Sequence, residues 1–104
     1  MFIATIPRIT NMKVSSITST SATIRWNPIS AKAKLSVSNI YITWRSLPSG
    51  SDKYEYLDKS MVEFGINTLT PNQKYEFKMS CIGNNNVNGQ FSDLLVFTTK
   101  HSSK

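Results

Sequence analysis

Strict alternation of apolar and polar residues is the feature that most limits how this chain can fold. In the stretch Tyr75-Glu76-Phe77-Lys78-Met79-Ser80-Cys81, every second side chain is apolar. Successive side chains of a β-strand point to opposite faces of a sheet, so the pattern predicts a strand with one buried and one solvated face. Shorter runs of the same kind, rich in β-branched and aromatic residues, recur along the chain. The alternation therefore predicts an all-β protein.

Six further strands are predicted on either side of this one, separated by clusters of turn-forming residues. They are marked by Met12, Val14 and Ile17; Ala22, Ile24 and Trp26; Ile40, Ile42 and Trp44; the stretch Tyr54-Glu55-Tyr56-Leu57; Val62, Phe64 and Ile66; and Leu95, Phe97 and Thr99, the last three pointing inward. Residues 18–21, 48–52 and 83–86 are rich in Ser, Thr, Pro, Gly and Asn, which favour turns. Seven short strands in one domain predict an antiparallel β-sandwich.

The length and composition are those of one compact domain. The chain has 104 residues, of which 39% are apolar and 17% charged, which excludes the disordered and membrane classes. No apolar run approaches the roughly 20 residues of a spanning helix, so direct membrane insertion is not expected. We expect an N-terminal flank at residues 1–6, the domain at residues 7–100, and a tail or linker at residues 101–104.

Residues that catalysis or metal binding would require are scarce. The chain has one cysteine, Cys81, and one histidine, His101, close to its C-terminal end. A zinc site or a Ser-His-Asp triad needs more ligands or a better placed base. Cys81 lies on the inward phase of its strand and is expected to be an inert core thiol. The spacing of Asp52, Glu55 and Asp58 splits them between faces and indicates solvated carboxylates. We expect no enzyme activity, metal or cofactor.

The charge balance favours anionic partners. Twelve Lys and Arg against six Asp and Glu give a formal net charge of +6. The basic residues are dispersed along the sequence, whereas nucleic-acid binding usually requires Lys and Arg clustered on one surface. No nucleic-acid partner is therefore expected. A polyanion such as heparan sulfate remains an alternative.

Three stretches resemble the fibronectin type III domain family. The sequence S-A-T-I-R-W-N-P at residues 21–28 looks like the second strand of the family, with Trp26 between the sheets. Leu69, Pro71 and Tyr75 match its L-x-P-x-x-x-Y segment, in which the Tyr forms a tyrosine corner, and F-T-T-K at residues 97–100 resembles its last strand. The resemblance covers roughly residues 7 to 100. It implies a seven-stranded, immunoglobulin-like β-sandwich of fibronectin type III topology.

These motif residues have structural roles that follow from their chemistry. Trp26 can bury on the order of 200 Å², which would anchor two sheets that no disulfide joins. Tyr75 is expected to return its hydroxyl to the backbone near Leu69. Pro71 restricts φ and cannot donate to a ladder, which suits a turn.

The resemblance also implies that three loops, at residues 27–39, 58–61 and 83–90, share one pole of the sandwich. Loops on a rigid sandwich commonly carry binding, and Asn tolerates positive φ and offers adaptable hydrogen bonds. A mobile hairpin loop without a partner is the alternative for the Asn-rich loop. The candidate binding residues are Lys32, Lys34, Asn84, Asn85, Asn86 and Asn88.

A second candidate surface is the outward face of the third, fourth and sixth strands. Tyr41, Arg45 and Lys78 would lie there. They make this face a candidate because aromatic and basic groups are enriched at interfaces. Their expected neighbours on this face are Thr43, Glu76 and Ser80, with Tyr54 or Tyr56. Ordinary cross-strand pairs, such as Tyr41 with Lys78, are the alternative explanation.

Three functions follow from these observations. The resemblance implies a non-enzymatic protein-interaction or spacer module of a larger receptor, adhesion or matrix protein. The alternatives are a glycosaminoglycan- or other anion-binding module, or an accessory domain of a larger enzyme. Most resembling domains are extracellular, so an extracellular or cell-surface location is expected, with the isolated domain a monomer.

Overall fold

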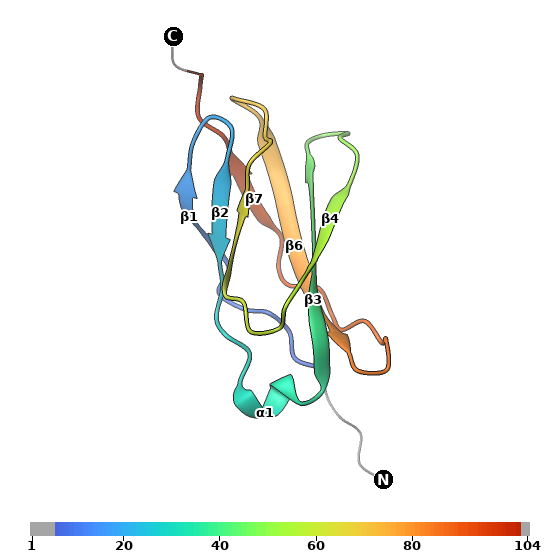
Figure 1. The fold of residues 1–104 in the computed structure, drawn as a ribbon. Coiled ribbons are helices and arrows are strands. Elements are labelled where there is room, and N and C mark those ends of the chain that lie inside the picture. Colours follow the sequence, from blue (N-terminus) through green and yellow to red (C-terminus); the bar gives the residue numbers. More distant parts are fainter. Residues whose placement is uncertain (1–5, 103–104) are drawn as a thin grey trace.

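Two antiparallel sheets form the domain (Figure 1). The computed structural model describes residues 6–102; residues 1–5 of the expected flank and 103–104 of the expected tail lie outside this part. One sheet has the strand order β1-β2-β5 and the other the order β4-β3-β6-β7. The elements of residues 6–102 are β1 (Lys13–Ile17), β2 (Ala22–Arg25), α1 (Ala31–Lys34), β3 (Val37–Ser46), β4 (Lys53–Leu57), β5 (Glu63–Ile66), β6 (Lys74–Gly83) and β7 (Leu95–Thr98). The predicted seven-stranded, all-β sandwich is confirmed.

The core follows the alternation of the sequence. Ile24 of one sheet and Ile40, Ile42, Phe77 and Met79 of the other are all 0% exposed. Each fully buried side chain of this kind contributes about 1.5–3 kcal/mol relative to its exposed state. The inward faces of the two sheets therefore supply the main stabilisation of the domain.

The motif residues lie where the two sheets and their crossover meet. Trp26 directly follows β2 and is 5% exposed, and its indole N–H donates to the carbonyl of Met61 at 3.0 Å. Leu69 is buried, and Pro71 lies in the turn before β6. The Tyr75 hydroxyl accepts a hydrogen bond from the backbone N–H of Thr70 at 2.8 Å, next to Leu69 as expected. The Trp26 bond therefore holds the connection between β4 and β5, and the Tyr75 bond holds the connection between β5 and β6.

The long segment between β2 and β3 departs from the expected loop at residues 27–39. It contains the helix α1, and β3 already begins at Val37. The Ser30 side chain caps the helix by accepting the N–H of Ala33 at 3.1 Å. Ala and Lys favour helix, so the cap followed by Ala-Lys-Ala-Lys was a local signal of this turn. Within residues 6–102, no helix is long and apolar enough to cross a membrane.

Candidate binding surfaces

Four aromatic rings gather on the outward face of the larger sheet. In the β3–β4 register Tyr41 pairs with Tyr56, and Thr43 pairs with Tyr54, which places the three tyrosines on one face. The ring centroid of Tyr41 lies 5.3 Å from that of Tyr56, 6.0 Å from that of Tyr54 and 6.3 Å from that of Phe91. We call Tyr41, Tyr54, Tyr56 and Phe91 the aromatic cluster.

Phe91 reaches this face from the segment between β6 and β7. The backbone N–H of Ser92 donates to the carbonyl of Met79 at 2.8 Å, and the Met79 N–H donates to the Ser92 hydroxyl at 3.0 Å. The Arg8 guanidinium also donates to the Phe91 carbonyl at 3.0 Å. The Lys78 amine lies 4.3 Å from the centre of the Phe91 ring, a cation–π contact. Sequence reasoning missed Phe91, because it lies outside every strand and follows no periodicity.

The expected neighbours on this face need two corrections. Lys78 is paired with Thr43 and not with Tyr41, which lies opposite Ser80. Thr43 and Ser80, expected to point outward into solvent, are 9% and 1% exposed. Tyr41 lies beside Ser80 on one side, and the hydrogen bonds between Met79 and Ser92 place Phe91 beside Ser80 on the other side. The rings of Tyr41 and Phe91 are therefore neighbours across the small Ser80 side chain.

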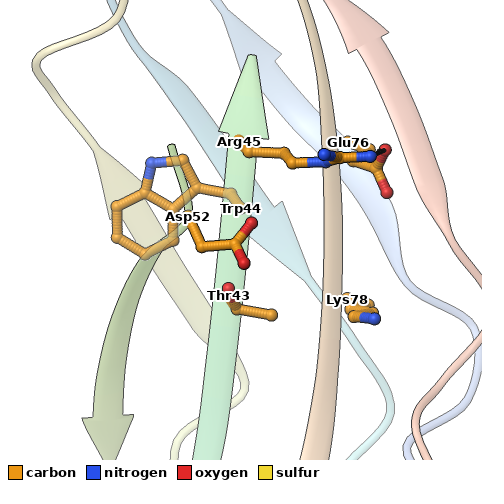
Figure 2. A pocket seen from close by; sticks show the side chains of 6 residues that line it. All are labelled: Thr43, Trp44, Arg45, Asp52, Glu76 and Lys78. Atoms are coloured by element: carbon orange, nitrogen blue, oxygen red, sulfur yellow. Dashed lines mark hydrogen bonds and ion pairs between the residues drawn. The ribbon is translucent and has the colours of Figure 1, made fainter. Parts of the chain in front are cut away.

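A charged hollow adjoins the aromatic cluster. In Figure 2, Arg45 of β3 reaches across to Glu76 of β6, where Nη2 lies 3.2 Å from Oε1. The hollow has a volume of about 170 Å³. Charges of both signs surround the hollow, and the Arg45 guanidinium is paired with the Glu76 carboxylate. The lining residues are Thr43, Trp44, Arg45, Asp52, Glu76 and Lys78.

Contacts between three connections hold one pole of the sandwich together (Figure 1). The Lys59 amine donates to the carbonyls of Lys34 and Val37 at 2.8 and 3.0 Å. The Asn84 carboxamide donates to the carbonyl of Leu35 at 2.7 Å. The segments at residues 27–39, 58–61 and 83–90 therefore do meet, as expected. Lys59, which sequence reasoning did not single out, joins two of them.

The pole carries less free positive charge than its sequence indicates. Lys32 is exposed and Lys34 half-buried on α1, whereas the amine of Lys59 is used in structural hydrogen bonds. Asp58 adds negative charge, because hydrogen bonds from the side chain and backbone of Ser60 lower the pKa of its carboxyl, with smaller contributions from nearby lysines. Of the asparagines, Asn84 is held by Leu35, while Asn85, Asn86 and Asn88 are exposed.

The groups available for chemistry are few in the described part of the chain. Residues 6–102 contain no group of three His, Cys, Asp or Glu side chains that could hold a metal ion. Cys81 is 0% exposed, and burial raises the pKa of its thiol to about 11. The thiol therefore stays protonated at neutral pH, which makes it a poor nucleophile.

A family model for the fibronectin type III domain matches residues 7–98. The chain belongs to the fibronectin type III family. This family is generally non-enzymatic.

Solved structures share the fold of this fibronectin type III domain. The FN1–FN3 domains of chicken CNTN1 superpose with a TM-score of 0.78 at 18% identity, covering 90% of this chain and 32% of theirs. The FN3 domain of human collagen XX has a TM-score of 0.78 at 20% identity, covering 93% and 95% of the two chains. The fn3 domain of human contactin 1 has a TM-score of 0.78 at 17% identity, covering 92% of this chain and 79% of that chain. A comparison with curated proteins found no match.

Proposed function

We propose that this domain is a non-enzymatic protein-interaction module that binds its partner through the aromatic cluster. The observation that carries the proposal is the exposure of that cluster: Tyr54, Tyr56 and Phe91 are 61%, 56% and 42% exposed. Tyrosine and other aromatic residues are enriched in the energetically dominant parts of interfaces. Strands β3 and β4 hold the tyrosines on a regular ladder, so little conformational entropy is lost on binding.

The surroundings of the cluster fit an interface better than a passive spacer. Binding interfaces combine a central group of aromatic anchors with a polar rim. Arg45, Glu76 and Lys78 supply such a rim on the side of the charged hollow. A pure spacer would have no use for exposed rings on the face of its sheet. We therefore assign anchoring to Tyr54, Tyr56 and Phe91, and orientation of the partner to Arg45 and Lys78.

The proposed setting is a larger receptor, adhesion or matrix protein, outside the cell or at its surface. Support comes from the structural neighbours, which include domains of contactins and of a collagen. The isolated domain is proposed to be a monomer.

Anion binding is the second candidate, favoured by the net charge of +6. In the described part of the chain Arg8, Arg25 and Arg45 are each paired with a carboxylate, so the excess charge rests mainly on lysines. Lys32 and Lys34 would then bind a polyanion such as heparan sulfate at the pole. Such charge-driven binding would be lost as salt is raised, because ions screen exposed charges.

The two candidates are separated by one capture experiment. The biotinylated domain is incubated with an extract of the source tissue, and retained proteins are quantified by mass spectrometry across a salt series. The double variant Tyr54→Ala/Phe91→Ala removes two anchors, and Lys32→Ala/Lys34→Ala is its control at the pole. We expect a salt-resistant partner that only the aromatic variant loses. A partner retained by the aromatic variant, or one released by moderate salt, would contradict the proposal.

A further inference from the structure

A second hollow lies beside the aromatic cluster, next to the turn after β6. It has a volume of about 400 Å³ and opens to solvent. That volume is within the range of small-molecule sites, about 300–1,000 Å³. Its walls come from β3, β4, β6 and the turn after β6. The lining residues are Asn39, Tyr56, Ile82, Asn86 and Asn88.

The lining has an unusual chemistry for a protein with a large positive charge. None of the five lining residues carries a charge, and three of them present carboxamides beside one exposed tyrosine ring. A carboxamide has two N–H donors and an acceptor oxygen; the oxygen of Asn39 already accepts from the Ser38 hydroxyl at 3.0 Å. A pyranose ring has the matching chemistry, with an apolar C–H face for an aromatic ring and hydroxyl groups that both donate and accept. A neutral sugar therefore fits this lining better than an acidic or sulfated one.

The turn that carries two of these carboxamides is fixed in place. The N–H of Gly83 donates to the carbonyl of Val87 at 2.7 Å, and the N–H of Asn86 donates back to Gly83 at 2.9 Å. Asn88 forms a bridge with Ile82. Asn86 has a φ of 65°, a conformation that Asn adopts more readily than most residues. A turn ordered in advance loses little entropy on binding a ligand.

The asparagines of this turn divide into one structural residue and two that are available. The Asn84 carboxamide is engaged by the Leu35 carbonyl. The side chains of Asn86 and Asn88 make no hydrogen bond with another residue in the range 6–102, although both line the hollow beside Tyr56. Their donors and acceptors are therefore free to bind hydroxyl groups.

We propose that this hollow binds a neutral sugar residue of a glycan. The sugar ring lies against the ring of Tyr56, and its hydroxyls exchange hydrogen bonds with the carboxamides of Asn86 and Asn88, with Asn39 at the far wall. This activity goes beyond the protein interaction proposed above. Tyr56 belongs to both surfaces, whereas Asn86 and Asn88 belong only to the hollow.

The test is a titration of the ¹⁵N-labelled domain with neutral trisaccharides, followed by amide chemical shifts. The probes are cellotriose, maltotriose, mannotriose and N,N′,N″-triacetylchitotriose, and a sulfated heparin disaccharide is the charged comparison. We expect saturable shifts for at least one neutral probe, at the amides of residues 39, 56 and 86–88. Saturation should not weaken with added salt, because no charged group lines the hollow.

Matched variants decide whether the binding belongs to the hollow. Asn86→Gly/Asn88→Ala, in which glycine accepts the positive φ of residue 86, should weaken it about tenfold or more, since hydrogen bonds to both carboxamides are lost. Lys32→Ala, which removes a charge at the same pole but does not line the hollow, should leave the affinity unchanged. The proposal is overturned if no neutral probe gives saturable shifts, if the double variant binds as well as the native domain, or if the sulfated probe alone binds. Because the partner capture relies on Tyr54 and Phe91, either proposal can fail without the other.

Discussion

Both backbone hydrogen-bonding groups of Met79 are paired with Ser92. The carbonyl of Met79 accepts the Ser92 N–H at 2.8 Å, and its N–H donates to the Ser92 hydroxyl at 3.0 Å. Met79 is 0% exposed, so water cannot replace either bond. Ser92 thus acts as a ladder partner for β6 before β7 begins, and it positions the neighbouring Phe91 on the aromatic face.

Replacing Ser92 by alanine should lower the free energy of unfolding by about 1–3 kcal/mol, because the buried N–H of Met79 would lose its acceptor. Urea denaturation measures the loss. Ser102→Ala, at an exposed position, is the control and should be neutral. Equal stabilities of the two variants would show that the hydroxyl does not support the segment.

Replacing Trp26 by alanine should cost about 3–5 kcal/mol, a large share of the roughly 5–15 kcal/mol by which a domain is stable. Its side chain is 5% exposed and its N–H is bonded to Met61. Trp26→Phe, which keeps much of the apolar area but loses that bond, should cost less. Urea denaturation is again the measurement, and a loss below about 1 kcal/mol for the alanine variant would argue against this anchoring role.

The stability of the domain should fall at alkaline pH partly through Cys81. Burial raises the pKa of its thiol from the ordinary 9.0 to about 11, so between these values the folded state holds a proton that the unfolded chain releases. The resulting stabilisation is complete below about pH 9 and is lost as the pH rises towards 11. Unfolding free energies at about pH 8 and about pH 10.5 should differ more for the native domain than for Cys81→Ala. Equal differences in the two proteins would contradict the assignment.

Strand β4 is an open edge of the larger sheet, and charges protect it. Lys53 and Glu55 pair with Trp44 and Ile42, which places them on the core side of the sheet, yet both are exposed. Inward-pointing charges of this kind discourage edge-to-edge pairing. We expect the native domain to sediment as a monomer and Lys53→Val/Glu55→Val to self-associate as its concentration rises. The control Lys100→Val/Asp52→Val makes the same change of charge outside the strands, and identical behaviour of the two variants would refute the edge argument.

Much of the fold could be predicted because the signals that specify it are local. The alternation around Phe77 identifies the buried face of β6 directly, since side chains of a strand alternate with a period of two. Helix α1 was missed because four residues give too short a pattern, although its Ser30 cap was visible. The expected Tyr41–Lys78 pair was wrong because register depends on how two strands meet and not on either strand alone.

The sequence by itself determined the strands, the core side of those with clear alternation, and the family. Only the tertiary structure decided which surfaces are assembled from them. Phe91 lies beside Tyr41 because Ser92 forms hydrogen bonds with β6. Asn86 and Tyr56 line the same hollow because the turn after β6 lies near β4. These partners are distant in the chain and lie partly in loops, where no periodicity indicates which way a side chain points. Their meeting is set by strand register and long-range backbone bonds, which exist only once the sheets have packed.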